Sequence, residues 1–262
     1  MKSPFKGKNI LLVGGAAGFG ASLGMDLMNS GANLFVLDRS PLGPEYSDKA
    51  PSVTYKKIDL TKGVEILKSL QRWSSSFKLD GIVYLTRGRE RYPLEEYTAK
   101  KRETDFLLNL DMFLEIVLML NSHSRLSPGC SIVTISSVCS NLIGSESLSY
   151  HISKAALESS TKYLAHQLGA LKIRVNCVQL GFIVKDEHKP IFYSAKNKTY
   201  KKWAEGVHPL GRVGHTSDVV DPIVFLLSEK SAFITGQIIT VDGGLTLQEP
   251  SYLAGKMTGI IK

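Results

Sequence analysis

Short apolar runs alternate with longer amphipathic stretches along nearly the whole chain. Within the stretch from Gly18 to Asn29, Phe19, Leu23 and Leu27 recur four residues apart, on one face of a helix. Strands that alternate with helices predict an α/β fold: a doubly wound parallel sheet with helices on both faces. The seven expected strands are Asn9–Val13, Asn33–Leu37, Val53–Ile58, Gly81–Leu85, Ser131–Ile135, Ile173–Val178 and Gln237–Val241.

Two further stretches have helical patterns of their own. Asp105–Leu120 is apolar nearly all round, so we expect it to be deeply buried or packed against another subunit. Tyr150–Leu168 begins with Tyr150 and Lys154, which share one helical face because they stand four residues apart. The sequence contains no repeat, low-complexity tract or linker-like change of composition, so we expect a single domain over residues 1–262.

The composition is that of a globular protein, with 262 residues, 43% hydrophobic and 21% charged. The cysteines Cys130, Cys139 and Cys177 are odd in number and lack Cys-x-x-Cys spacing, so we expect no disulfide framework, no metal site and a reducing cytoplasm. Ile10–Val13 is too short for a signal-peptide core, and Phe113–Leu120 is too short for a membrane span. We therefore expect a cytoplasmic protein without membrane insertion.

The net charge of +8 and the pI near 9.3 indicate an anionic partner. No nucleic-acid-reading motif accompanies this charge, so we expect no nucleic-acid partner. An anionic small molecule and an acidic carrier protein remain open. Six lysines fall within eighteen residues, in either a solvated loop or an anion-attracting segment: Lys185, Lys189, Lys196, Lys198, Lys201 and Lys202.

A glycine-rich string, VGGAAGFG, follows the first predicted strand and opens the first predicted helix. Its glycines at Gly14, Gly18 and Gly20 allow a tight turn and let backbone N–H groups approach a pyrophosphate. The strand before the turn and the helix after it are the context in which such a string is informative. The string therefore predicts a Rossmann dinucleotide-binding turn.

The end of the second predicted strand carries an acid that bears on the choice of cofactor. Asp38 lies eighteen residues beyond Gly20, where a carboxylate accepts hydrogen bonds from the ribose hydroxyls of NAD and repels a 2′-phosphate. Arg39 has the opposite effect, because a guanidinium can bind that phosphate. Ala17 supplies no second cation. We predict NAD as the cofactor, with NADP as the alternative.

Taken together, these features resemble the short-chain dehydrogenase/reductase family, in its compact single-domain branch. The resemblance extends from about Lys8 to Leu245, and the order and spacing of the motifs carry it rather than any one of them. The further matching segments are Asp59–Leu60, Asn109–Leu110, Ser131–Ser137, Tyr150–Leu157, Ile173–Val178, His208–Gly214 and Phe233–Gly244.

The resemblance implies a catalytic set of Asn109, Ser137, Tyr150 and Lys154. A tyrosine hydroxyl has a pKa near 10, and a neighbouring ammonium and the nicotinamide cation favour its deprotonated form. Tyr150 would thus exchange a proton with the substrate, and Lys154 would supply the charge and bind the nicotinamide ribose. Ser137 would donate to the substrate oxygen. Asn109 would help to hold a water that links Lys154 to solvent.

The resemblance also implies the cofactor contacts, among them Asp59 and Leu60 at the adenine. The full expected set is Gly14, Gly18, Phe19, Gly20, Asp38, Arg39, Asp59, Leu60, Tyr150, Lys154, Gly181 and Ile183.

Four positions depart from the family's pattern, all at the cofactor's edges. Val13 replaces a threonine, Tyr84–Gly88 replaces Asn-Asn-Ala-Gly, and Leu180 replaces a proline. Lys185 replaces a threonine that often contacts the nicotinamide amide. Because the catalytic positions are intact, we expect hydride chemistry to be retained, whereas these changes leave the cofactor's affinity open.

Two segments beyond the central motifs bear on the substrate and on assembly. Residues 185–206 correspond to the family's mobile substrate lid, whose lysines would suit an anionic substrate such as a nucleotide sugar, a polyketide-like acid or an acyl carrier thioester. Arginines at 87, 89 and 91 would extend that positive field. Residues 246–262 form a C-terminal extension that is either disordered or packed at a subunit interface. The lid aromatics are Phe192, Tyr193, Tyr200 and Trp203, and the extension's apolar residues are Tyr252, Leu253, Met257, Ile260 and Ile261.

The sequence thus predicts an oxidoreductase that transfers a hydride between NAD(H) and a secondary alcohol or ketone, with an anionic small molecule as substrate. The alternatives are an NADP-dependent 3-oxoacyl carrier-protein reductase and a nicotinamide-nucleotide-binding regulator without turnover. The resemblance also implies a homo-oligomer, either a dimer or a tetramer.

Overall fold

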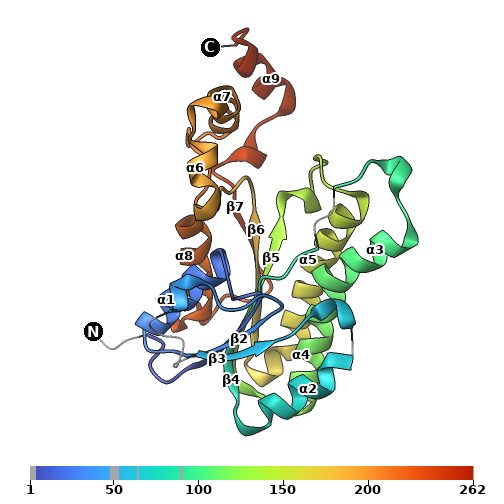
Figure 1. The fold of residues 1–262 in the computed structure, drawn as a ribbon, viewed down its shortest axis with the longest axis vertical. Helices are drawn as coiled ribbons and strands as arrows, with labels where there is room; N and C mark the ends of the chain where they lie inside the picture. The colour runs from blue at the N-terminus through green and yellow to red at the C-terminus, as the bar shows by residue number, and fades with distance from the viewer. Residues whose placement is uncertain (1–3, 48–52, 64, 89–90, 262) are drawn as a thin grey trace.

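A computed structural model describes residues 4–47, 53–63, 65–88 and 91–261. Within these residues the centre of the molecule is a seven-stranded parallel sheet in the order β3-β2-β1-β4-β5-β6-β7 (Figure 1). Strand order reverses next to β1, which pairs with β2 on one side and β4 on the other. The doubly wound prediction is confirmed. The strands are β1 Asn9–Val13, β2 Asn33–Asp38, β3 Val53–Lys57, β4 Leu79–Tyr84, β5 Leu126–Ser137, β6 Arg174–Leu180 and β7 Ile238–Val241.

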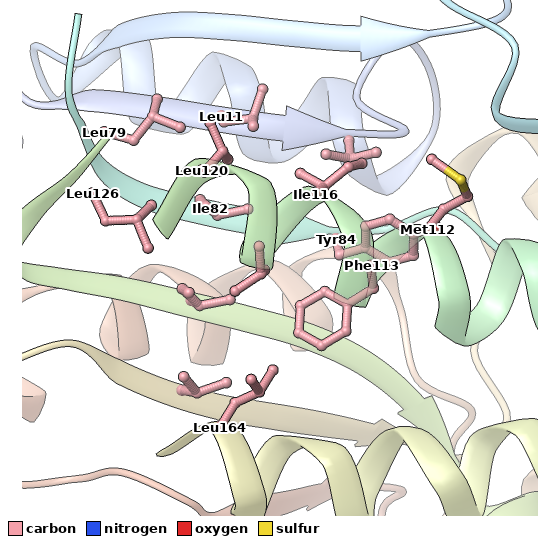
Figure 2. Packing of buried hydrophobic residues seen from close by; sticks show 14 of the residues in the cluster. Leu11, Leu79, Ile82, Tyr84, Met112, Phe113, Ile116, Leu120, Leu126 and Leu164 are labelled. Carbon is pink, nitrogen blue, oxygen red and sulfur yellow. The ribbon is translucent and has the colours of Figure 1, made fainter. Parts of the chain in front are cut away.

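Helices cover both faces of the sheet (Figure 1). Helices α1 (Phe19–Asn29) and α8 (Thr216–Leu227) pack on one face, and α2 (Glu65–Trp73), α4 (Met112–Ser122) and α5 (Leu148–Leu168) pack on the other. The side chains of β1 alternate between the two resulting cores, because successive residues of a strand point to opposite faces. Figure 2 shows the core on the face covered by α2, α4 and α5, where strand residues pack against Phe113 and Ile116 of α4.

The predicted strands are confirmed in place, and β5 and β6 each continue two residues beyond their predicted carboxyl ends. β5 continues through two serines to Ser137, which pairs in register with Leu180 of β6. β6 likewise continues beyond the predicted Val178. Polar residues at a strand's end carry no hydrophobic signal, so the backbone pairing extends further than the pattern indicates. The extension places Ser137 at the carboxyl edge of the sheet.

The stretch predicted as one helix over Asp105–Leu120 is divided into three. Helix α3 (Ala99–Phe106) leads into a π-helical turn, Leu107–Asp111, and then into α4. A continuous α-helix was therefore a wrong prediction at the turn, which contains Asn109. The prediction of deep burial is confirmed for Phe113, Ile116 and Leu120, although Leu118 is half exposed.

Three helices gather beyond the carboxyl ends of β6 and β7 (Figure 1, orange and red). They are α6 (Lys189–Phe192), α7 (Lys198–Gly206) and α9 (Pro250–Thr258). Phe192 and Ala204 form a small separate core with Val184 and Val213. The C-terminal extension contributes α9, whose Met257 lies close enough to Gly206 that a Cβ on that glycine would be 3.3 Å from the sulfur. The lid and the extension are therefore neighbours.

None of the helices in the described residues combines the length and apolar character that a membrane span requires. The three cysteines carry free thiols, and those of Cys130 and Cys177 are buried.

Candidate active site

The glycine turn has the geometry that its sequence predicts. Gly14 has φ +87° and Gly18 has φ +56°, in the region that only glycine enters readily. The Gly14 N–H donates to the carbonyl of Leu37 at 2.8 Å, which fastens the turn to β2. A Cβ on Gly20 would lie 2.5 Å from the Gly14 carbonyl oxygen, so the turn closes on itself. The close turn brings the chain from β1 directly into the start of α1.

A buried tyrosine, which the sequence did not indicate as a site residue, forms hydrogen bonds with the backbone of this turn. The Tyr46 hydroxyl donates to the carbonyl of Gly15 at 2.9 Å, with the carbonyl of Gly20 at 3.3 Å. Gly24 of α1 leaves the necessary space, because any side chain there would overlap the hydroxyl. Burial raises the pKa of Tyr46, so the hydroxyl stays a donor at all ordinary pH. The pair of Gly24 and Tyr46, far apart in sequence, gave no local signal.

Asp38 lies at the carboxyl end of β2, beside the glycine turn. Its Oδ2 accepts from the N–H of Ala16 at 3.0 Å and its Oδ1 accepts from Ser40 at 2.9 Å. These bonds hold the carboxylate in place and leave lone pairs for a ribose. Arg39 is exposed next to it.

The predicted adenine contacts, Asp59 and Leu60, follow β3. Asp59 caps the short turn that begins at Leu60, accepting from the backbone and hydroxyl of Thr61 at 3.0 and 2.8 Å. These hydrogen bonds lower the pKa of Asp59. Leu60 is buried. The structure gives both residues structural roles, and their contact with adenine stays a prediction.

The unusual segment after β4 makes ordered contacts in place of those expected for the family's own sequence. Leu85 donates its N–H to the carbonyl of Val13 at 2.8 Å. Thr86 packs on Gly14, where a Cβ would lie 2.9 Å from the threonine hydroxyl. The buried Tyr84 donates its hydroxyl to the carbonyl of Leu108 at 2.7 Å. The segment thus joins the glycine turn to the π-helical turn.

Asn109 lies in that π-helical turn and is fully buried. Its Oδ1 accepts from the N–H of Gly88 at 3.1 Å, and its Nδ2 donates to the Gly88 carbonyl at 3.2 Å and to Ser153 Oγ at 3.1 Å. The amide therefore joins the end of β4 to α5. Its expected role in holding a water toward Lys154 stays a prediction.

Of the remaining candidate catalytic residues, Ser137 is the last residue of β5, and Tyr150 and Lys154 lie in the first two turns of α5. Ser147 caps α5, its hydroxyl accepting from the Tyr150 N–H at 3.2 Å. Tyr150 is 5% exposed and Lys154 is 2% exposed. The Lys154 ammonium lies 5.6 Å from the centre of the Tyr150 ring and donates to the carbonyl of Ile135, two residues before Ser137, at 2.9 Å. The chain thus places a buried cation beside the phenol.

Burial lowers the pKa of Lys154 from 10.5 to about 8. The positive charge of Arg87 acts in the same direction, whereas Glu158 and Asp105 favour the charged form. At pH 7 the ammonium is therefore still charged. A modest increase in pH neutralises it.

Two buried acids surround this region, and the sequence analysis identified neither. Asp105 accepts hydrogen bonds from the hydroxyls of Ser147, at 3.0 Å, and Ser149, so it fixes the start of α5. Glu158 accepts from Ser136 at 2.7 Å, Ser140 at 2.6 Å and Gln179 at 2.8 Å, joining α5 to β5 and β6. An acid on the apolar face of a predicted helix is the signal that would have found both.

The segment after β6 contains two of the expected cofactor contacts, Gly181 and Ile183, and then Lys185. Gly181 packs against Asp242, where a Cβ would lie 2.6 Å from the aspartate Cβ, and Ile183 forms a bridge with Gly214. Lys185 then brings its ammonium to 5.4 Å from the centre of the Phe19 ring, at the start of α1. Glu187, which the sequence analysis did not consider, lies 3.7 Å from that ammonium.

The basic lid is less positive than its lysine count indicates. Lys185 pairs with Glu187 at 3.7 Å, Lys189 with Asp186 at 2.6 Å, and Lys201 with Glu205 at 3.7 Å. Three arginines were expected to extend the positive field. Arg87 is exposed, the Arg91 guanidinium is paired with Glu146 at 2.8 Å, and Arg89 lies outside the described residues.

A nicotinamide dinucleotide fits most of this arrangement. The glycines of the turn present no side chain of their own to a pyrophosphate, Asp38 lies where a ribose acceptor is needed, and Lys154 lies beside Tyr150. Glu187 is the exception, because its carboxylate faces the turn. Across the described residues, no group of three or more histidines, cysteines or acids is placed to hold a metal ion.

Comparisons with known proteins agree with this geometry. Residues 14–246 match the protein-family model described as "Enoyl-(Acyl carrier protein) reductase". The chain is 27% identical over 252 residues to a 3-oxoacyl-(acyl-carrier-protein) reductase of Chlamydia muridarum, covering 94% of this chain and 100% of the relative. It is 31% identical over 255 residues to a tropinone reductase homolog of Arabidopsis thaliana, covering 94% and 96%.

A solved structure shows the same likeness. A short-chain dehydrogenase family protein from Francisella tularensis superposes with a TM-score of 0.80 at 26% identity, covering 92% of this chain and 100% of the other. The glycine turn, the tyrosine–lysine pair of α5 and the near full-length matches agree: the chain belongs to the short-chain dehydrogenase/reductase family, the NAD(P)-dependent dehydrogenases and reductases that act on alcohol and carbonyl groups.

Proposed function

We propose that this protein interconverts a secondary alcohol and a ketone with NAD(H), in a single domain that both binds the cofactor and carries out the chemistry. The observation that carries the proposal is the buried pair on α5, with the Lys154 ammonium 5.6 Å from the Tyr150 ring. A buried cation beside a buried phenol is costly unless it serves the phenol or a ligand.

The roles of the residues follow from what the reaction requires. The bound nicotinamide supplies or accepts the hydride. In the reducing direction the carbonyl oxygen gains negative charge, which the Ser137 hydroxyl stabilises by donating a hydrogen bond, and then takes a proton from Tyr150. In the oxidising direction Tyr150 takes the proton from the alcohol. Lys154, charged at pH 7, favours the tyrosine's deprotonated form.

The preference for NAD over NADP is part of the proposal and is supported by Asp38. Its carboxylate is fixed at the end of β2 by two backbone N–H groups, so it cannot easily turn away from a 2′-phosphate. The test is a titration of the purified protein with NADH and NADPH, followed by nicotinamide fluorescence. We expect tighter binding of NADH, and we expect Asp38→Asn to reduce the difference. A wild-type preference for NADPH would overturn the assignment.

The second candidate is an NADPH-dependent 3-oxoacyl carrier-protein reductase. It is favoured by the exposed Arg39 next to Asp38 and by the likeness to a protein of that name. A solved gluconate 5-dehydrogenase from Burkholderia cenocepacia of the same fold, 22% identical, contains NADP. Reduction of acetoacetyl thioesters with NADPH, faster than any reaction with NADH, would select this candidate. Nucleotide binding without turnover of any alcohol or ketone would instead indicate the regulator.

We further propose that the substrate is anionic and that residues 185–206 cover it. Support comes from the exposed Lys196, Lys198 and Lys202 on the same segment as the half-exposed Tyr193 and Tyr200. The triple replacement of these lysines by alanine should raise KM for an anionic substrate and leave KM for a neutral one unchanged. Equal KM values for the anionic substrate before and after the replacement would contradict the proposal.

Assembly into a dimer or tetramer is proposed as well. Leu118 of α4 and Leu148, Ile152 and Tyr163 of α5 expose between 45% and 66% of their surface, which is a large apolar exposure for two adjacent helices. Light scattering of the purified protein tests this proposal, and a mass of one chain at micromolar concentration would refute it.

A further inference from the structure

Two oppositely charged side chains from the segment after β6 face the glycine turn. A Cβ on Gly18 would lie 3.4 Å from Oε1 of Glu187 and 3.6 Å from Nζ of Lys185. The same ammonium lies over the Phe19 ring and 3.7 Å from the Glu187 carboxylate. Both groups therefore occupy the space directly in front of the first residues of α1.

This space attracts negative charge for two reasons. The start of a helix carries partial positive charge from its unpaired N–H groups, and Lys185 adds a full positive charge. Glu187 presents its carboxylate here, 3.7 Å from the Lys185 ammonium and 3.4 Å from the place of a Cβ on Gly18. The carboxylate thus stands at the place where the glycine turn would hold a pyrophosphate.

A pyrophosphate and the Glu187 carboxylate repel each other at such short range. Lys185, by contrast, is attracted to both of these anions. Its ammonium has three hydrogen-bond donors and no acceptor, so either anion can compensate its charge. The pyrophosphate carries two negative charges, one on each phosphate, whereas the carboxylate carries one. A nicotinamide amide, by contrast, would leave the ammonium's charge uncompensated.

We propose that Lys185 binds the cofactor's pyrophosphate and exchanges its ion-pair partner, from Glu187 in the free protein to the phosphates in the complex. Glu187 then acts as an internal competitor that weakens cofactor binding. The inference rests on the proposed function only in requiring that a dinucleotide binds at the glycine turn. It gives Lys185 a different contact from that of the threonine it replaces.

The experiment measures dissociation constants for NADH and for ADP-ribose, which keeps the pyrophosphate and lacks the nicotinamide. The variants are Lys185→Met, which preserves the aliphatic stem on Phe19, and Glu187→Gln. Lys189→Met is the matched control, because Lys189 forms a comparable ion pair with Asp186 on the same segment. Thermal unfolding checks that each variant is folded.

We expect Lys185→Met to weaken both ligands by about tenfold, and by less at 0.5 M salt, since a charged hydrogen bond is lost. Glu187→Gln should tighten both by about threefold, and Lys189→Met should change neither. Weaker binding of NADH with unchanged ADP-ribose would overturn the proposal, because Lys185 would then contact the nicotinamide.

Failure of the proposed function gives a different result. If the folded wild-type protein binds neither NADH, NADPH nor ADP-ribose, the proposed function fails and this inference fails with it. If the wild type binds and Lys185→Met binds equally well, only the inference fails. Unchanged or weaker binding by Glu187→Gln overturns the competitor role.

Discussion

The two halves of the site differ in how closely they follow the family's sequence pattern. In the region around the start of α5, the four candidate catalytic residues match the pattern that the resemblance implies, and hydrogen bonds hold Asn109, the Tyr150 backbone and the Lys154 ammonium. At the cofactor's edges, by contrast, four positions depart from that pattern, and two of the departing side chains make contacts of their own: Tyr84 donates to the carbonyl of Leu108, and the Lys185 ammonium lies over the Phe19 ring. The proposed reaction requires particular residue types in the first region, whereas cofactor binding in the second requires a shape and a charge that several side chains can supply.

The largest effect should come from the first region. Tyr150→Phe removes the only group placed to exchange a proton with the substrate in our proposal, so kcat for any ketone that the wild type reduces should fall about 1,000-fold. The dissociation constant for NADH should remain within a factor of two or so, because packing is preserved. Stopped-flow kinetics and fluorescence titration measure the two quantities.

Tyr163→Phe is the control, since Tyr163 is 66% exposed on the same helix. A Tyr150→Phe protein that retains a tenth or more of the wild-type kcat would show that another group carries the proton, and the contrast between the two regions would lose its basis.

The next effect concerns the shape of the glycine turn. Gly20→Ala places a Cβ 2.5 Å from the Gly14 carbonyl, so the turn must open, at a cost of about 2–3 kcal/mol in the free energy of unfolding, with much weaker NADH binding. Urea denaturation and titration test both. Gly169→Ala is the control, because no atom lies within 4 Å of a Cβ there. Equal losses in the two variants would mean that closure of the turn is not the cause.

The charge of Lys154 gives a pH-dependent prediction. Its pKa is about 8 in the folded protein and 10.5 ordinarily, so between pH 8 and 10.5 the unfolded chain binds more protons and the folded form gains stability as pH rises. Lys154→Met lacks this dependence. The stability advantage of Lys154→Met over the wild type should therefore shrink by about 2 kcal/mol from pH 7 to pH 10.

Urea denaturation of both proteins at the two pH values measures this difference, and the other titrating groups cancel because they are shared. A constant difference between the two proteins would show that Lys154 keeps an ordinary pKa, and the ammonium would then be better solvated than its burial indicates.

The smallest effect tests the replacement contacts near the cofactor. Tyr84→Phe loses the hydrogen bond to Leu108 and should cost about 1 kcal/mol of stability, with a small rise in the dissociation constant for NADH. Tyr252→Phe, at a position 45% exposed, should cost nothing measurable. Should Tyr84→Phe be as stable as the wild type, the segment after β4 would not depend on its unusual side chains.

The doubly wound parallel sheet could be predicted from the sequence. So could the elements on which most of the candidate site residues lie. Hydrophobic periodicity indicated the buried face of α1, on which Leu23 and Leu27 recur four residues apart and are fully buried. The glycine turn was equally accessible, because Gly14 and Gly18 lie between a strand and a helix and take the positive φ that glycine permits.

What the sequence did not reveal are contacts between residues far apart along the chain. Tyr46 under the turn, Asp105 at the start of α5 and Glu187 in front of α1 all act across long separations. The lysine-rich lid shows the reverse error: counting charges overstated its field, because three of its lysines have acidic partners on the same segment.

The π-helical turn at Leu107–Asp111 has a consequence for how this chain can change length. A π turn holds one residue more than an α turn needs, so the loss of a single residue there would leave a regular helix and an intact apolar face on α4. Such a deletion would retract Asn109 from Gly88 and Ser153 while sparing the core. If Asn109 has its proposed role, the helix would tolerate the shortening whereas the proposed reaction would slow.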